Sequence, residues 1–267
     1  MIDIKNAYVS FNKITDLYKD LEDEIGFNSK LEHTYHVAKT SKELATLLNL
    51  DTENICLAEL IGLLHDIGRF EELKVMNSFK GIKLDHAEYG VIMLFEDNLI
   101  TNFVSEEKYY PIIRNAIYNH NKFHIQDNLD DVSLLHSKII RDSDKLDNFR
   151  IETEHASEKH FVNVVESEEE MENSLISDAV LNSIQNHECV KLIDRQTPLD
   201  YYICLLGFVF DINFKETFDI IKNKNYISIL IDKFNYTIPE TREKMKAIKQ
   251  IILNYIDKKI WLTRKRT

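Results

Sequence analysis

The sequence predicts an all-α protein, and two of its features support this fold class. Six glycines and three prolines among 267 residues leave few positions that would interrupt a helix. Apolar residues recur three or four positions apart over most of the chain, the spacing that places side chains on one face of a helix. Because 44% of the residues are hydrophobic, the chain can bury a large core as one domain, or as one domain with an appendage.

The helical spacing begins at the N-terminus. It predicts one amphipathic helix over residues 4–21, on the positions of Ile4, Tyr8, Phe11, Ile14, Tyr18 and Leu21. The same spacing predicts further helices over residues 30–50, 52–65, 85–99, 106–119 and 132–149.

The amino-acid composition of the chain changes after residue 150. Apolar positions become fewer between residues 151 and 200, and the acidic run 166–170 is expected to be a solvated loop or helix face. Past Pro198 the chain is strongly apolar again and predicts packing helices that end near Trp261. We therefore expect a helical core over residues 1–150, followed over residues 151–267 by an acidic connector and C-terminal helices that pack on the core.

Charge and cysteine content limit the partners and the compartment. A net charge of −12 argues against a long nucleic acid or an anionic membrane as the main partner, and the basic end 264–266 is too short to reverse this. The three cysteines are widely spaced, which suggests neither a disulfide framework nor a thiolate zinc site. Without a signal-like N-terminus or a long apolar stretch, the chain is expected to be soluble and cytoplasmic. The sequence is compatible with a homo-oligomer as well as with a monomer.

An apolar stretch ends on an adjacent histidine and aspartate, His65 and Asp66. Such a pair can bind one divalent ion, and the second carboxylate oxygen can bridge to another ion. Alone, the dipeptide more often marks a helix end with a hydrogen-bonded imidazole. Other candidate ligands lie at helix ends or on inner faces, and helix bundles build metal sites from such converging side chains. They are His33 or His36, His86, His120 and Asp144.

The order of these residues resembles the HD superfamily of metal-dependent phosphohydrolases. The family signature is a histidine, then a His-Asp pair about thirty residues later, then a distal aspartate. The resemblance implies the metal ligands His33, His65, Asp66 and Asp144. The first motif of the family places the ligand three residues before an arginine or similar residue that is followed by Val-Ala. In this chain His36 occupies that intermediate position before Val37-Ala38, so the resemblance favours His33 as the ligand and His36 as a supporting or core histidine. Asp142 and Asp147 flank Asp144, but the register Ser143-Asp144-Lys145 fits the final motif of the family.

Two further histidines point to the binuclear members of the family. His86 begins the helix that follows the His-Asp segment, and His120 ends the helix before the final aspartate. Some members have a second histidine where this chain has Asn121. The resemblance covers about residues 30–149 and implies an HD-domain helical bundle with a C-terminal helical extension.

The resemblance also implies a reaction. The chain would cleave a phosphoester or phosphoanhydride of a small nucleotide or related phosphate by a metal-bound hydroxide, with Asp66 shared between two ions. Nitrogen and oxygen ligands suit one or two ions of Fe, Mn, Co, Ni or Zn, and the sequence does not choose among them. Arg69 is a candidate phosphate ligand or a partner of Glu71 or Glu72. Lys145 is a candidate phosphate contact or, slightly favoured, a residue that holds Asp144.

Two other functions remain compatible with the sequence. Some histidine-aspartate helical sites belong to di-iron enzymes that oxidise a non-phosphate substrate. A non-catalytic nucleotide-binding regulatory module is the other alternative, although an intact set of ligands argues against it. No nucleophile elbow, P-loop or dinucleotide fingerprint occurs in the sequence.

Overall fold

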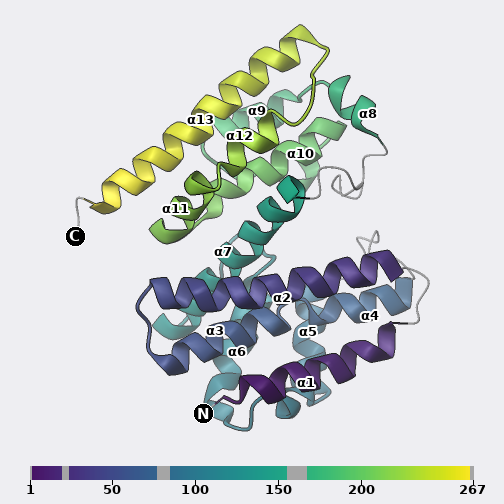
Figure 1. The fold of residues 1–267 in the computed structure, drawn as a ribbon, viewed down its shortest axis with the longest axis vertical. Coiled ribbons are helices and arrows are strands. Elements are labelled where there is room, and N and C mark those ends of the chain that lie inside the picture. Colours follow the sequence, from purple (N-terminus) through teal and green to yellow (C-terminus); the bar gives the residue numbers. More distant parts are fainter. Residues whose placement is uncertain (1, 20–23, 77–84, 155–166, 265–267) are drawn as a thin grey trace. The chain divides into compact units, whose positions relative to one another are not determined.

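The chain folds into helices joined by turns and loops (Figure 1). The structure is a computed structural model that describes residues 2–19, 24–76, 85–154 and 167–264. Because these residues contain no strand, the prediction of an all-α fold is confirmed. The chain divides into two compact units, Met1–Asp147 and Asn148–Thr267, which are described separately below.

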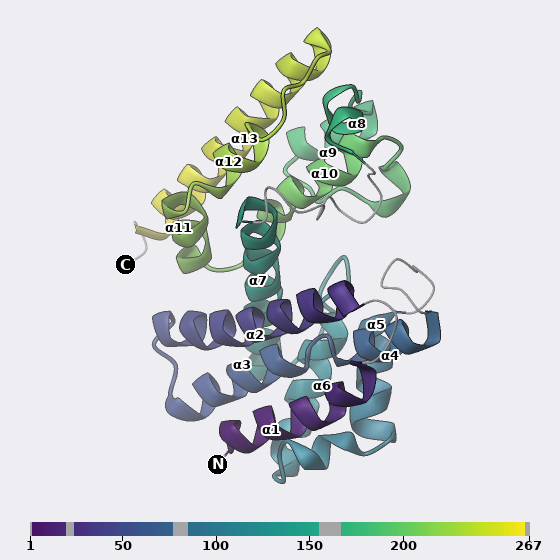
Figure 2. The ribbon, with the colours of Figure 1, turned by 45° about the vertical axis from the view of Figure 1, so that its right-hand side comes forward.

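The first unit is built around a pair of adjacent helices, α2 (Glu24–Leu47) and α3 (Thr52–Leu64), which run side by side in Figures 1 and 2. Helix α3 also packs against α1 and α6, and α5 packs against α4 and α6. The other helices of this unit are α1 (Ile4–Thr15), α4 (Ile67–Met76), α5 (His86–Val91), α6 (Tyr110–Asn119) and the first part of α7 (Asp131–Glu154).

Helix α3 is the central element of the first unit. Its first turn is capped by Asp51, whose side chain accepts a hydrogen bond of 2.8 Å from the N–H of Asn54. All eight residues from Leu57 to Leu64 are buried, so the second half of the helix is covered on every side. Gly62 allows α2 to approach, since a Cβ there would lie 2.7 Å from the Cα of Ala38.

The observed helices differ from the predicted ones in several places. The prediction of one α-helix over residues 4–21 is wrong at its end, because α1 stops at Thr15 and a 3₁₀ turn follows over Asp16–Tyr18. The helix predicted over 85–99 is also wrong at its end: α5 continues into a π-helical turn, Ile92–Glu96, and Asn98 has a φ of 60°. Helix α7 begins one residue earlier and ends five residues later than predicted.

The second unit has its own core. Tyr202 is fully buried there, and its hydroxyl donates a hydrogen bond of 2.8 Å to the carbonyl of Leu230. The long helix α13 packs against α9, α11 and α12. The helices of this unit, drawn in green and yellow in Figure 2, are α8 (Glu168–Glu172), α9 (Asp178–Gln185), α10 (Pro198–Gly207), α11 (Lys215–Asn223), α12 (Tyr226–Ile231) and α13 (Pro239–Arg264).

The acidic run lies partly in this unit. Residue 166 is outside the described part of the chain, while residues 168–170 form the exposed first turn of α8, as expected for a solvated helix face. Residues 265 and 266 of the basic C-terminal run are also outside the described part. Among the described helices, none combines the length and the apolar character needed to cross a membrane.

Candidate metal centre

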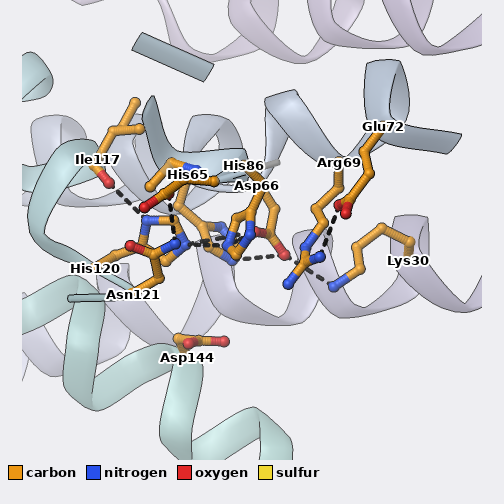
Figure 3. A network of polar contacts seen from close by, with 12 residues as sticks. Lys30, His65, Asp66, Arg69, Glu72, His86, Ile117, His120, Asn121 and Asp144 are labelled. Atoms are coloured by element: carbon orange, nitrogen blue, oxygen red, sulfur yellow. Dashed lines mark hydrogen bonds and ion pairs between the residues drawn. The ribbon is translucent and has the colours of Figure 1, made fainter. Parts of the chain in front are cut away.

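Histidine and aspartate side chains from five segments of the first unit meet at one place, and Figure 3 labels those from four of them. Two of the side chains come from the turn between α3 and α4, and the others come from α2, from the first residue of α5, from the end of α6 and from α7. The structure thus brings together all six ligands expected from the sequence, which are His33, His65, Asp66, His86, His120 and Asp144. His36 does not join them, because its side chain is 39% exposed and lies 3.9 Å from Glu32.

Asp66 lies between two pairs of histidines. Its Oδ2 atom is 3.6 Å from Nε2 of His33 and 3.4 Å from Nε2 of His65. Its Oδ1 atom is 3.4 Å from Nε2 of His86 and 3.5 Å from Nε2 of His120. Asp144 adds Oδ1 to the first pair, at 3.3 Å from Nε2 of His33. Each oxygen of one carboxylate therefore faces a different histidine pair.

Hydrogen bonds fix the orientation of three of these rings. The Nδ1 atom of His33 lies 2.7 Å from Oδ2 of Asp147, and those of His65 and His120 lie 2.8 Å and 2.6 Å from the carbonyls of Gly62 and Ile117. An Nδ1–H that donates to an oxygen leaves Nε2 with a lone pair. In the neutral form of each ring, Nε2 would therefore face the centre of the cluster with its lone pair, which is the arrangement of metal-binding histidines.

The donor atoms fit a divalent ion. Two ligands of one ion, each about 2.1 Å from it, lie about 3.0 to 3.4 Å apart. The Nε2 atoms of His86 and His120 are separated by 3.1 Å. Nε2 of His65 is completely buried and has no hydrogen-bond partner in the described part of the chain, a costly state for a polar atom unless it binds something.

Comparison with known protein families agrees with this geometry. Residues 31–149 match the family model described as HD domain. Residues 31–149 form an HD domain. The comparisons with curated proteins and with solved structures found no match. HD domains bind divalent metals and generally belong to metal-dependent phosphohydrolases, so the match supports a metal-dependent hydrolase whose metal is not identified.

The charges within the HD domain keep the aspartates ionised. Burial would raise the pKa of Asp66, but Lys30, His65 and His120 outweigh it and hold that pKa well below its usual range. For Asp144, burial is likewise outweighed, here by His33, and the pKa is lowered. Both carboxylates are therefore negatively charged at neutral pH, as metal ligands must be.

His86 is kept neutral. Burial, together with the nearby cations Arg69 and Lys30 and against the opposing effect of Asp66, lowers its pKa to about 2. A neutral imidazole can donate its lone pair to a metal, whereas a protonated one cannot.

Arg69 and Lys145 were expected to contact phosphate or to form ion pairs. Arg69 donates a hydrogen bond of 2.7 Å from Nη1 to Oε2 of Glu72, so the ion-pair alternative is present, with Glu72 and not Glu71 as partner. Its guanidinium is nevertheless near the centre, because it lowers the pKa of His86 (Figure 3). Lys145 is buried on α7 of the HD domain, next to Asp144, and its role stays a prediction.

Three residues with structural roles at the centre were not identified from the sequence. Asp147 holds His33, Lys30 contacts Oδ2 of Asp66 at 2.8 Å, and Asp85 caps the helix that begins with His86. The available signal was spacing: Asp147 is three residues after Asp144, and Lys30 is three residues before His33, each on the same helix face. Asp85 precedes an expected ligand, in the N-cap position that favours aspartate.

Asp85 also ties together the two segments that carry His86 and His120. It accepts a hydrogen bond of 2.8 Å from Nδ2 of Asn121 and a further one from Lys122. Burial would raise the pKa of Asp85, but these two donors outweigh it and lower the pKa to about 2. The amide of Asn121 thus binds the residue that caps α5.

Arg141 supports the same segment from α7. Its guanidinium is buried and donates hydrogen bonds of 2.6 Å to the carbonyls of Asn119 and Lys122, on either side of His120. The carbonyl of Asn119 ends α6 and that of Lys122 follows the helix, so neither has a partner within it. Arg141 therefore stabilises the backbone that presents His120.

Proposed function

We propose that the chain is a metal-dependent phosphohydrolase that cleaves a phosphoester or phosphoanhydride of a small nucleotide or a related phosphate. The observation that supports this most is the position of Asp66, with one oxygen toward His33 and His65 and the other toward His86 and His120. That arrangement suits two divalent ions that share one carboxylate.

The residues divide into two ligand sets. His33, His65, Asp66 and Asp144 would hold one ion, and His86, His120 and Asp66 would hold another. Divalent ions at these positions would activate a water molecule and neutralise negative charge on a phosphate. The chain itself keeps both aspartates ionised, orients three of the imidazoles, and places the guanidinium of Arg69 beside the centre, where it can bind a phosphate oxygen.

The small size of the proposed substrate follows from charge. At −12 the chain repels a long polyanion, while a single phosphate group can be attracted by local cations. We therefore favour nucleotides and small phosphate esters over nucleic acids.

The proposal is tested by metal analysis followed by a substrate screen. Protein purified without chelator should retain up to two equivalents of a transition metal, and should release phosphate from at least one member of a panel of nucleotides and phosphate esters. Asp66→Asn, which removes the shared carboxylate while keeping its shape, should lose metal and reduce turnover by roughly 1,000-fold. Asp97→Asn, at an exposed position of the same unit, should change neither quantity.

Two results would contradict the proposal. Full turnover in Asp66→Asn would exclude this centre as the catalytic one. Retained iron with a mixed-valence signal, together with no release of phosphate from any ester, would instead favour an oxidative di-iron enzyme.

A further inference from the structure

A lysine ion pair lies at the shared carboxylate. Lys30 is on α2, one turn before His33, and its Nζ atom is 2.8 Å from Oδ2 of Asp66. The Lys30 side chain is 23% exposed, whereas that of Asp66 is 5% exposed. Lys30 therefore lies between solvent and the innermost carboxylate of the centre.

The oxygen that Lys30 contacts is also needed by a metal ion. Oδ2 is the Asp66 atom that faces His33 and His65, at 3.6 Å and 3.4 Å from their Nε2 atoms. An ion held by these two histidines would bind the same oxygen. An ammonium group and a divalent cation repel each other at such a separation, so their binding to Oδ2 is mutually unfavourable.

Arg69 limits where Lys30 can go. The guanidinium of Arg69 is anchored by Glu72, whose side chain is only 1% exposed, and both Arg69 and Lys30 lie near enough to His86 to lower its pKa. A lysine displaced from Asp66 would share this region with a fixed positive charge. An anion between the two cations would satisfy both, and phosphate oxygens bind lysine and arginine well.

We propose that Lys30 binds the substrate's phosphoryl group, and that a divalent cation at Oδ2 of Asp66 releases Lys30 for this role. The inference rests on the proposed function and adds to it a phosphate-binding residue on α2. Lys30 and Arg69 then form one anion subsite beside the centre. Metal binding and phosphate binding are coupled through a single side chain, since the lysine can serve either the carboxylate or the phosphate.

The coupling predicts that one substitution of Lys30 will raise the affinity for Mn²⁺ and lower the affinity for phosphate. Lys30→Met keeps the length of the side chain but removes its charge. It should bind Mn²⁺ at least about threefold more tightly than the wild type, because the competing ammonium is gone. It should bind inorganic phosphate about 10- to 100-fold more weakly when loaded with Mn²⁺, because a charge-assisted hydrogen bond is lost. Isothermal titration calorimetry measures both affinities on the full chain.

Two further variants separate this role from a structural one. Lys30→Arg keeps the charge and should restore phosphate affinity to within about threefold of the wild type. Lys74→Met removes an exposed lysine of α4 that pairs with Glu71 at 3.2 Å, and should change neither affinity.

The outcomes distinguish failure of this inference from failure of the proposed function. Weaker Mn²⁺ binding by Lys30→Met would show that Lys30 supports the ligands, and unchanged phosphate binding would show that it does not contact phosphate. Either result overturns the inference even if the enzyme hydrolyses phosphate esters. If the wild type neither binds phosphate nor releases it from any ester, the proposed function fails, and the role of Lys30 in phosphate binding fails with it, whatever the Mn²⁺ affinities.

Discussion

The chemistry of the centre depends on which nitrogen of each histidine faces inward. For His65 and His120 the acceptor of Nδ1–H is the carbonyl three residues earlier in the chain, so the backbone itself sets the ring orientation. For His33 the acceptor is a carboxylate from another helix, Asp147. A carboxylate partner also makes the imidazole a stronger metal ligand, so this pair is the one most open to a test.

Asp147→Asn should weaken metal binding without unfolding the protein. The amide keeps the size of the side chain but loses the negative charge that orients His33 and increases its basicity, so we expect about 10- to 100-fold lower metal affinity. Metal titration followed by calorimetry measures this. Glu32→Gln is a suitable control, because Glu32 lies 3.9 Å from His36, which is outside the centre. An unchanged affinity in Asp147→Asn would show that the backbone alone orients His33.

The sequence could predict the ligands at this centre but not their supporting residues. His65-Asp66 is an adjacent pair, and the order of the other histidines along the chain matches a family pattern. Lys30 and Asp147 carry no such pattern. Their roles depend on which helix lies opposite their own, and spacing along one helix gives only the face on which a side chain lies.

A histidine outside the centre should make the fold sensitive to acid. His136 on α7 is 1% exposed, and its Nε2 atom is 2.9 Å from Oδ1 of Asn54 on α3. Burial lowers its pKa to about 4, compared with about 6.5 in an unfolded chain. Between these values the unfolded chain binds a proton that the folded chain does not, so the free energy of unfolding decreases as the pH falls.

His136→Gln should remove this dependence. Each pKa unit corresponds to about 1.4 kcal/mol, so the wild type should lose roughly 3 kcal/mol more than the variant between pH 7 and pH 4. Urea unfolding at several pH values measures the difference, and His124→Gln, in an exposed loop, is the matched control. Parallel pH profiles for the wild type and His136→Gln would contradict the assignment.

At the scale of elements, the short helix α5 has the least support of its own. It has six residues, and its first residue is His86. Its position depends on the cap by Asp85 and on close contact with α4 at Gly68, where a Cβ would lie only 2.2 Å from the carbonyl of His86. The ligand set that includes His86 therefore depends on packing between short elements.

Two capping residues allow this dependence to be tested with a matched pair of variants. Asp85→Ala removes the cap of α5 and the bonds from Asn121 and Lys122, and should weaken binding of the second metal equivalent by about 10- to 100-fold while the first is retained. Asp51→Ala removes the cap of α3 at the end far from His65, and should cost about 1 kcal/mol of stability with both equivalents bound. Metal content after dialysis against limiting Mn²⁺ measures both. Equal losses of bound metal in the two variants would show that Asp85 has no specific role in positioning His86 and His120.

Element types were easier to predict than element ends. The apolar spacing located most helices of the first unit, but it did not predict α4, which follows Asp66 directly. It also predicted one continuous helix over residues 85–99, whereas α5 ends at Val91. The reason is that spacing reports which residues face the core and not the backbone conformation, which changes to a π-helical turn and then to positive φ at Asn98.

At the scale of the whole chain, all the candidate ligands lie in one of the two units. His33 is the first of them and Asp144 the last, so the entire set falls within Met1–Asp147. The second unit, Asn148–Thr267, has a separate core around Tyr202 and contributes no ligand from its described residues. Bound metal should therefore stabilise the first unit directly, because a ligand stabilises the state that binds it.

Hydrogen exchange can locate that stabilisation. At a free Mn²⁺ concentration about 100 times the dissociation constant, the first unit should gain about 2.7 kcal/mol, which corresponds to about 100-fold slower exchange of the amides that open only on its unfolding. Peptides from α2, α3 and α6 should show this change, whereas peptides from α9 to α13 should exchange at the same rate with Mn²⁺ or with a chelator. The Asp66→Asn variant is the control and should show no change in either unit. Equal slowing in both units of the wild type would contradict the prediction, because it would mean that the metal stabilises Asn148–Thr267 as strongly as the unit that holds the ligands.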